Sequence, residues 1–269
     1  MPELPEVETV TNSVKKHIIN KSFKSIDILW PKTLHNFTTA DFKQKIEGKK
    51  VIDVFRRAKY IIIQFEKNLL AIHLRMTGKL YVVDSFDKNQ KHISLYLQFD
   101  NKYLIYEDTR KFGRFYMYEN MDTLNNKLGI EPLSDTFSQK WLIDSMKTKK
   151  RQIKSLLFDQ SFICGLGNIY IDESLWRAKI HPLALSHKIS KAKIINLHSS
   201  IIKVLSDSIK LGGSTIRDYT YDFAYVGNYA LNLKVFGKDG QKGPRCDLII
   251  TKTKVAQRGT HYCKKCQRK

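Results

Sequence analysis

The sequence of 269 residues lacks any apolar run that approaches the roughly 18 residues of a membrane-spanning helix. Acidic residues are also scarce, because 26 Asp and Glu stand against 47 Lys and Arg. Only four cysteines are present. Three of them gather near the C-terminus, which favours a reducing compartment and a metal site over disulfides. No secretory signal peptide is visible, since the N-terminus is acidic. These absences predict a cytoplasmic protein without a membrane-spanning helix.

The formal net charge of +21 is far from ordinary for a globular chain. Such an excess predicts a polyanionic partner, most simply nucleic acid, whose binding weakens as the salt concentration rises. Two alternatives stay open at this point: a ribosomal-type or merely soluble basic protein, and a protein drawn to anionic membranes. The chain is long enough for two domains with cores of their own.

The first half of the chain shows a helix followed by many short strands. Val7, Val10, Val14 and Ile18 recur at three- and four-residue steps, which predicts a helix with one apolar face, beginning near Pro5. Segments rich in β-branched and aromatic residues then cover 26–30, 51–55, 60–65, 69–74, 80–83, 93–99 and 103–106. Such a series predicts a β-sandwich or barrel of roughly 115 residues.

Helical periodicity replaces the strand pattern from about residue 122. Predicted helices cover 139–147, 151–159, 168–178 and 190–211, and the last ends at two glycines. From about residue 233 the chain is expected to form a β-hairpin that carries three of the cysteines. The predicted fold is therefore a multidomain α+β protein. An N-terminal β-sandwich domain flanked by helices (1–118) precedes a helical domain (131–232) and a C-terminal hairpin (233–269), with a hinge near 115–131.

The first residues offer a candidate nucleophile. A methionine that precedes proline is normally removed, and the chain would then begin with the secondary amine of Pro2, whose pKa would be near ~8. Attack of this amine on a sugar's anomeric carbon would give an iminium, which is an electron sink. Glu3 follows directly as a carboxyl group suited to proton transfer. The alternative is an ordinary acidic helix start behind two prolines.

Six motifs, in order along nearly the whole chain, resemble those of bacterial formamidopyrimidine-DNA glycosylases. They are PELPEVETV at 2–10, RRAKY at 56–60, DTRKFG at 108–113, GLGNIYIDE at 165–173, GGSTIRDY at 212–219 and QRGTHYCKKCQ at 257–267. The resemblance implies a monomeric bacterial enzyme of base-excision repair, both a DNA glycosylase and an abasic-site lyase. It would remove oxidised purines (8-oxoguanine and formamidopyrimidines) from double-stranded DNA through a proline Schiff base, followed by β,δ-elimination.

Two rival functions stay open beside this one: an endonuclease VIII-like glycosylase for oxidised pyrimidines, and a catalytically silent protein that binds lesions. The motifs of the N-terminus and of residues 165–173 favour the purine branch, and the intact pair of Pro2 and Glu3 argues against a silent protein. The resemblance also implies a loop within 213–229 that closes over the flipped purine. Its sequence here, TYDFAYVGNYA, is not the usual glycine-rich one.

The resemblance also implies the roles of individual residues. Catalysis is assigned to Pro2, Glu3, Glu6, Lys59 and Arg258. DNA contacts are assigned to His73, Met76, His92, Arg110, Phe112, Lys150, Lys154 and Asn168. Three of these would fill the gap left by the flipped nucleotide, namely Met76, Arg110 and Phe112. Residues 165–168 would start a helix–two-turn–helix element that grips the DNA backbone, with Asn168 in contact with a phosphate. Without the resemblance, a lone Met in a turn is ordinary packing and the basic strand end at 56–60 is an ordinary solvated surface.

A zinc finger with two CxxC pairs is the last feature that the resemblance implies. The pair of Cys263 and Cys266 is intact, but only Cys246 remains of the first pair, because Gly243 occupies the other position. Zn²⁺ would then be bound by Cys246, Cys263 and Cys266, and three thiolates do not complete a tetrahedral site.

The missing fourth ligand has several candidates in the sequence. It could be His261, Asp247 or a water molecule, and His261 would share a strand face with a residue two positions later. A metal-free finger held by packing of Tyr262 and Ile249 stays open as well. Cys164 lies in an apolar run and is expected to be buried packing.

Overall fold

The computed structural model describes residues 1–214 and 228–269. The chain divides into two compact units: Met1–Asn126 with Gly212–Gly227, and Lys127–Leu211 with Asn228–Lys269. The division into three domains at 1–118, 131–232 and 233–269 stays a prediction. The expected purine-covering loop falls largely on 215–227, outside the described residues. Within the described ranges, no helix is both long and apolar enough to cross a bilayer.

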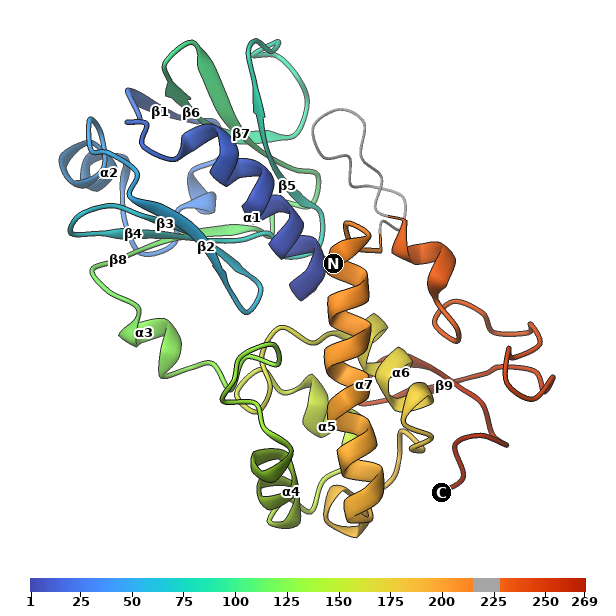
Figure 1. Cartoon of the computed structure of the whole chain (residues 1–269). Helices are drawn as coiled ribbons and strands as arrows, with labels where there is room; N and C mark the ends of the chain where they lie inside the picture. The colour runs from blue at the N-terminus through green and yellow to red at the C-terminus, as the bar shows by residue number, and fades with distance from the viewer. Residues whose placement is uncertain (215–227) are drawn as a thin grey trace. The chain divides into compact units, whose positions relative to one another are not determined.

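The first unit is a β-sandwich, as the strand pattern predicts. Two antiparallel four-stranded sheets have the strand orders β1-β6-β7-β5 and β2-β3-β4-β8 (Figure 1). Side chains of both sheets and of one face of helix α1 share a single core. The helices are α1 (Leu4–Ile18), α2 (Thr39–Lys45) and α3 (Asp122–Asn125), and the strands are β1 (Ser25–Ile28), β2 (Asp53–Arg57), β3 (Tyr60–Gln64), β4 (Leu69–His73), β5 (Gly78–Val83), β6 (Ile93–Phe99), β7 (Lys102–Asp108) and β8 (Arg114–Tyr118).

Helix α1 packs along the edge strands β2 and β5, one from each sheet (Figure 1). Its apolar stripe of Val7, Val10, Val14 and Ile18 is fully buried, as the spacing predicts. Burying a Val or Ile side chain stabilises a fold by roughly 1.5 to 3 kcal/mol. The stripe therefore anchors the N-terminus firmly against the sandwich.

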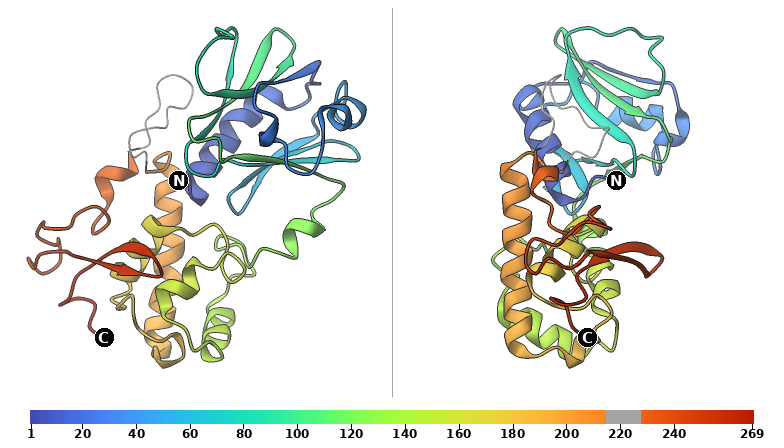
Figure 2. Two further views of the ribbon diagram at one scale, coloured as in Figure 1. Left: turned by 180° about the vertical axis from the view of Figure 1, so that it is seen from behind. Right: turned by 90° about the vertical axis from the view of Figure 1, so that its right-hand side faces the viewer.

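The second unit is helical and ends in a two-stranded hairpin. Helix α7 packs on α4 and α6, and α6 also packs on β10 of the hairpin (Figure 2). The elements are α4 (Gln139–Lys147), α5 (Ile153–Phe158), α6 (Asn168–Arg177), α7 (Lys191–Lys210), β9 (Thr251–Val255) and β10 (Arg258–Tyr262). Between the strands, Ala256 and Gln257 both have positive φ, 50° and 61°. This is the backbone of a tight two-residue hairpin turn, and it places Arg258 directly beside the tip.

Candidate functional site

The N-terminus is held in place by one buried carboxylate. Pro2, Glu3 and Glu6 are all buried. Glu6 Oε2 accepts the backbone N–H of Glu3 at 2.8 Å, and Glu6 Oε1 accepts the N–H of Ser214 at 2.8 Å and its hydroxyl at 3.2 Å. A Cβ on Gly213, which has a φ of +87°, would lie 2.9 Å from Glu6 Oε1. Only glycine allows this approach without a shift, and the result is a fixed backbone next to Pro2.

Lys59 lies in the two-residue turn between β2 and β3. It is 5% exposed, and the preceding Ala58 has a φ of +53°. Arg56 supports the turn, because its Nη1 donates to the carbonyl of Ala58 at 3.1 Å while its Nε pairs with Glu8 at 2.6 Å. Glu8 belongs to α1. Arg56 therefore links the turn that carries Lys59 to helix α1, which follows directly after Pro2 and Glu3.

His73 ends strand β4 as a buried, neutral imidazole. Its Nδ1 accepts the N–H of Arg75 at 3.0 Å, and its ring meets the edge of Tyr60 with centroids 4.7 Å apart. Burial, with smaller effects from the charges of Arg75 and Lys59, lowers the pKa of His73 to about 3. Since Nδ1 is an acceptor, the proton belongs on Nε2. His73 can thus donate a neutral hydrogen bond to DNA but cannot form a salt bridge with a phosphate.

Three residues expected to fill the DNA gap lie together on two neighbouring turns. Arg110 Nη1 lies 3.0 Å from Met76 Sδ, and its Cζ lies 4.8 Å from the ring centre of Phe112. Met76 is 43% and Phe112 48% exposed, which is unusual for such large apolar side chains. An exposed apolar pair around a cation is the composition of a wedge that enters a base step. His92 is exposed, and its carbonyl accepts a backbone N–H from the end of β7.

Asp108, the last residue of β7, holds both turns and is a residue that the sequence reasoning missed. Its side chain is fully buried. Oδ1 accepts the Thr77 hydroxyl at 2.5 Å and the Arg110 N–H at 3.1 Å. Oδ2 accepts the Gly113 N–H at 2.8 Å and the Tyr106 hydroxyl at 3.3 Å. The available signal was its place as the first residue of DTRKFG, directly after an alternating strand.

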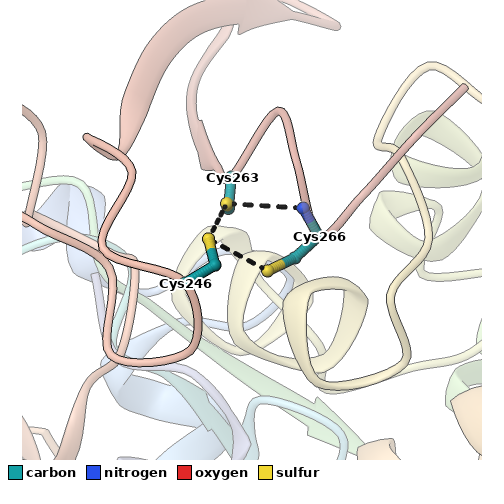
Figure 3. A group of neighbouring side chains, drawn as sticks. All are labelled: Cys246, Cys263 and Cys266. Atoms are coloured by element: carbon teal, nitrogen blue, oxygen red, sulfur yellow. Dashed lines mark hydrogen bonds between the residues drawn. The ribbon is translucent and has the colours of Figure 1, made fainter.

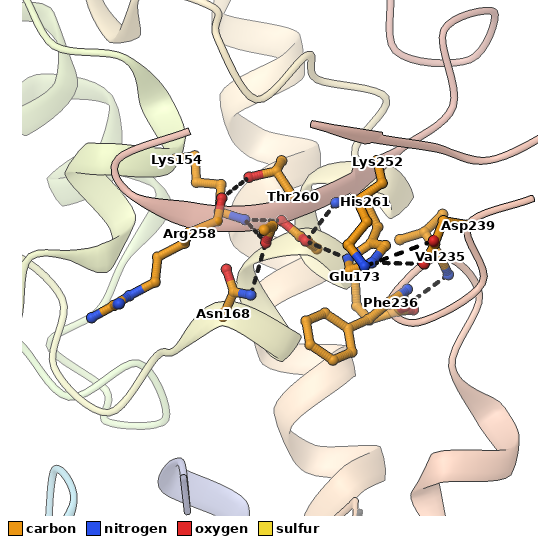
Figure 4. A network of polar contacts seen from close by, with 12 residues as sticks. Lys154, Asn168, Glu173, Val235, Phe236, Asp239, Lys252, Arg258, Thr260 and His261 are labelled. Atoms are coloured by element: carbon orange, nitrogen blue, oxygen red, sulfur yellow. Dashed lines mark hydrogen bonds and ion pairs between the residues drawn. The ribbon is translucent and has the colours of Figure 1, made fainter. Parts of the chain in front are cut away.

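In the second unit, the start of α6 holds the tip of the hairpin (Figure 4). Asn168 Nδ2 donates to the carbonyl of Gly259 at 2.9 Å. Arg258 is exposed, and its guanidinium Cζ lies 5.3 Å from the ring centre of Phe158. The structure therefore brings Arg258, with a predicted role in catalysis, and Asn168, a predicted DNA contact, to one end of the hairpin.

Lys154 is placed differently from the expected DNA contact. It forms an ion pair with Asp172 at 2.6 Å in which the side chains are 1% and 0% exposed. Its Nζ also donates to the carbonyl of Gly259, at 3.3 Å, and Asp172 accepts the backbone N–H of His261 at 2.8 Å. Lys154 therefore supports the hairpin through this buried ion pair, and its contact with DNA stays a prediction. Lys150, by contrast, is exposed and stays a predicted DNA contact.

Glu173, the neighbour of Asp172 on α6, holds the chain that leads into the hairpin. Its carboxylate accepts the backbone N–H groups of Lys234, Val235 and Phe236 at 2.8 to 3.0 Å (Figure 4). Burial raises the pKa of Glu173, while these three N–H groups oppose the rise. The two adjacent acidic residues of α6 thus fix both ends of the segment from 234 to 261.

Three cysteine sulfurs form a cluster of the size that zinc requires (Figure 3). The Sγ of Cys246 lies 3.3 Å from that of Cys263 and 3.4 Å from that of Cys266, and all three lie within 4.8 Å of one another. Tetrahedral zinc with Zn–S bonds near 2.3 Å needs sulfurs about 3.8 Å apart. A backbone hydrogen bond at Leu248 lowers the pKa of Cys246, while burial raises the pKa of Cys266 to about 11. The cluster fits zinc as three of its four ligands, and the ion would join the two turns that carry the cysteines.

Three family models match the chain in succession. They are the formamidopyrimidine-DNA glycosylase N-terminal domain (1–115), the formamidopyrimidine-DNA glycosylase H2TH domain (128–220) and a zinc finger found in FPG and IleRS (240–268). The chain belongs to the formamidopyrimidine-DNA glycosylase family. A relative of that name from Protochlamydia amoebophila is 42% identical over 276 residues, with all of both chains covered.

Solved structures of Lactococcus lactis members of this family have the same fold. A variant of that FPG in complex with Fapy-dG containing DNA is 38% identical and has a TM-score of 0.94, with both chains fully covered. The complex of the same protein with abasic-site DNA has a TM-score of 0.92 at 38% identity and covers 99% of this chain and 100% of its own. The β-sandwich, the helical part and the finger-like hairpin are therefore confirmed.

Unlike a four-ligand finger, the described part of the chain, 1–214 and 228–269, adds no His, Asp or Glu side chain to the cluster of three cysteines. Among the described residues, the metal-sized cluster contains neither His261 nor Asp247. The His261 ring lies instead with Nδ1 3.5 Å from Asp172 and Nε2 3.2 Å from Asp239. Cys164 is buried, as expected, with its Sγ 3.4 Å from a backbone carbonyl.

The packing expected for a metal-free finger is only partly present. Tyr262 is 9% exposed and packs on His181, but Ile249 is 51% exposed. Ile250, the next residue, is buried and joins the cysteines, Trp176 and a valine in one apolar cluster. The prediction that Ile249 packs in the finger was therefore wrong, and Ile250 packs there instead.

Proposed function

We propose that this chain excises oxidised purines, 8-oxoguanine and formamidopyrimidines, from double-stranded DNA and then cleaves the strand as an abasic-site lyase. The observation that carries the proposal is the buried Pro2–Glu3 terminus fixed by Glu6, in a chain with a net charge of +21. A substrate of chromosomal DNA implies a bacterial cytoplasmic enzyme, and nothing in the mechanism requires more than one chain.

The first step uses the N-terminal amine. With Met1 in place the Pro2 nitrogen is an amide, so removal of Met1 must precede the reaction. The freed amine attacks C1′ of the lesion nucleotide, the bond from C1′ to the base breaks, and the base leaves with a proton. Glu3 gives a proton to the sugar's ring oxygen as the ring opens, which leaves an iminium between Pro2 and C1′.

Strand cleavage follows from the iminium as an electron sink. Loss of a proton from C2′ breaks the C3′–O bond and expels the 3′ phosphate, and a second elimination breaks the C5′–O bond. Lys59 is the group proposed to carry the proton in the first elimination, supported by its buried place on the turn beside α1. Arg258 is proposed to hold a phosphate that flanks the lesion, supported by its exposed position at the hairpin tip.

Base flipping needs a filler for the gap in the duplex. Extruding a nucleotide costs a few kcal/mol, and wedge side chains offset that loss. Met76, Arg110 and Phe112 are proposed for this role, because all three are exposed and Arg110 contacts both of the others. Neutral His73, the half-buried Asn168 and the exposed residues His92 and Lys150 would contact the flanking backbone.

Borohydride trapping on three duplexes tests the proposal. Duplexes containing 8-oxoguanine, an oxidised pyrimidine or an abasic site are incubated with the enzyme and reductant, and the crosslink is mapped by mass spectrometry. The expected crosslink lies on the Pro2 amine, with 8-oxoguanine preferred over the pyrimidine. An N-terminal tag that retains Met1 is the control and should abolish trapping. A crosslink on an internal lysine refutes the nucleophile, a pyrimidine preference favours the endonuclease VIII-like function, and tight binding without trapping indicates a silent protein.

A further inference from the structure

The two turns that carry the cysteines share one hydrogen-bond pattern. In the first, the N–H of Asp247 donates to the carbonyl of Gly243 at 3.3 Å. In the second, the N–H of Gln267 donates to the carbonyl of Cys263 at 2.9 Å. Each turn thus closes between its first and fifth residues, with a cysteine in fourth place. Gly243 therefore holds in one turn the position that Cys263 holds in the other, and it is where a fourth thiolate would arise.

The protein atoms around Gly243 do not replace that thiolate. A Cβ added there would meet the terminal Cδ1 of Ile250 at 3.0 Å and the carbonyl of Leu248 at 3.2 Å. The carbonyl already accepts the Gly243 N–H at 2.8 Å, and a methyl group has no donor electrons for a metal. Cys246 and Cys266 are only partly buried, so solvent reaches the cluster from their side.

Backbone N–H groups donate hydrogen bonds to two of the three sulfurs. The N–H of Cys266 donates to the Sγ of Cys263 at 3.5 Å, and the backbone N–H of Leu248 donates to the thiol of Cys246. Such hydrogen bonds stabilise thiolates and orient metal ligands. The three sulfurs are thus arranged as ligands, while the tetrahedral preference of zinc leaves one position to be filled.

We propose that this centre binds one zinc ion through Cys246, Cys263 and Cys266 and takes its fourth ligand from outside the chain, as water or another small monodentate donor. Three protein ligands with one exchangeable position is the pattern of an open zinc site, in contrast to a closed structural one. The ion is bound more weakly than by four thiolates, and its fourth ligand exchanges. This inference does not depend on the glycosylase reaction.

Cobalt substitution in the full-length protein tests the proposal without reference to activity. Co²⁺ takes the place of zinc, and its visible absorption reports coordination number and ligand type. One equivalent should bind with a tetrahedral thiolate spectrum, and added imidazole should shift that spectrum by replacing the outside ligand. Binding below about a tenth of an equivalent, or a spectrum that imidazole does not change, would overturn the proposal.

Gly243→Cys and Gly243→Ala form a matched pair for the same test. Both add the Cβ that presses on Ile250, whose terminal methyl can yield by a few tenths of an ångström, but only cysteine adds a sulfur. In competition with a chelator, Gly243→Cys should bind zinc at least about tenfold more tightly than the parent and lose the response to imidazole. Gly243→Ala should gain no affinity and keep the response. Equal gains in zinc affinity in both variants would show that packing causes the effect, and would refute position 243 as the place of the missing fourth ligand.

The cobalt measurement on the unmodified protein does not depend on whether the Gly243 variants fold. A further variant, Cys266→Ser, removes one of the three ligands without adding bulk, and it should abolish stoichiometric cobalt binding. Retention of one equivalent in this variant would show that the ion binds elsewhere, which also refutes the proposal.

Discussion

Replacing Asp108 by Asn should loosen the two turns that carry the wedge residues while leaving the side-chain volume unchanged. The buried carboxylate accepts four hydrogen bonds, two on each oxygen. An amide keeps one oxygen for Thr77 and Arg110. Its NH₂ group then faces the N–H of Gly113, so a donor meets a donor where the carboxylate accepted at 2.8 Å.

The size of the effect follows from these contacts. A hydrogen bond to a charged group contributes about 1.5 to 3 kcal/mol, and an unsatisfied buried donor costs a similar amount. We therefore expect the free energy of unfolding to fall by about 3 kcal/mol. The turn from 110 to 113 would also shift, and a misplacement of about 1 Å can lower a rate by roughly 100-fold. Excision from a lesion duplex should accordingly fall between roughly 10- and 100-fold.

Single-turnover kinetics on two substrates separate positioning from general damage. In the proposed mechanism, excision of 8-oxoguanine from a duplex needs the wedge of Met76, Arg110 and Phe112, whereas cleavage at a preformed abasic site in a single strand does not. The second rate should therefore fall far less. Tyr106→Phe is the control, since it removes only the weakest donor, at 3.3 Å, and should stay within about 1 kcal/mol of the parent. Equal losses on both substrates, or no loss on the duplex, would refute the role of Asp108.

Three further outcomes are expected. Lys154→Ala should lower the free energy of unfolding in urea by roughly 3 to 5 kcal/mol, because it leaves the buried Asp172 carboxylate without its lysine counter-charge, and a smaller loss would contradict the support role. Lys150→Ala should leave the free energy of unfolding unchanged but weaken the salt dependence of DNA binding. If about six phosphates are neutralised, the logarithm of the DNA-binding constant of the parent falls with the logarithm of the salt concentration with a slope of roughly −5, and the variant's slope should be shallower by about 1. Because the pKa of His73 is lowered to about 3, the unfolded chain binds its proton first as the pH falls. The free energy of unfolding therefore decreases as the pH falls from roughly 6.5 to 3, and at pH 5 it is lower by about 2 kcal/mol. His73→Gln should remove this contribution to the pH dependence of stability.

The sequence predicted those elements whose signal is local. Strict alternation places a strand at 93–99, the bounds of β6, and a serine cap with helical spacing places a helix at 139–147, the bounds of α4. Helix α2 was missed because only Phe42 of its seven residues is buried, which leaves no periodicity. Strand β8, which directly follows DTRKFG, was missed, since the strands predicted from the sequence end at 103–106.

The side-chain contacts that the sequence did not reveal depend on partners far along the chain. Lys154 belongs to a basic run in which nothing local marks it as buried, since its counter-charge Asp172 lies 18 residues later. Asp108 bonds to Thr77, 31 residues earlier. His261 was expected to share a strand face with Cys263, two positions later. Strand β10 ends at Tyr262, so the alternation of faces does not extend to Cys263.

The bond between Glu6 and Ser214 has a consequence for the order of synthesis. The two residues are 208 positions apart, yet they belong to the same compact unit. A ribosome working at roughly 5 to 20 residues per second needs on the order of 10 to 40 seconds to reach Ser214. Until then, the nascent sandwich lacks the donors that complete the shell around Glu6. The reactive end of the enzyme is therefore made first, but the shell around Glu6 is completed only after helices α1 to α7 have been synthesised.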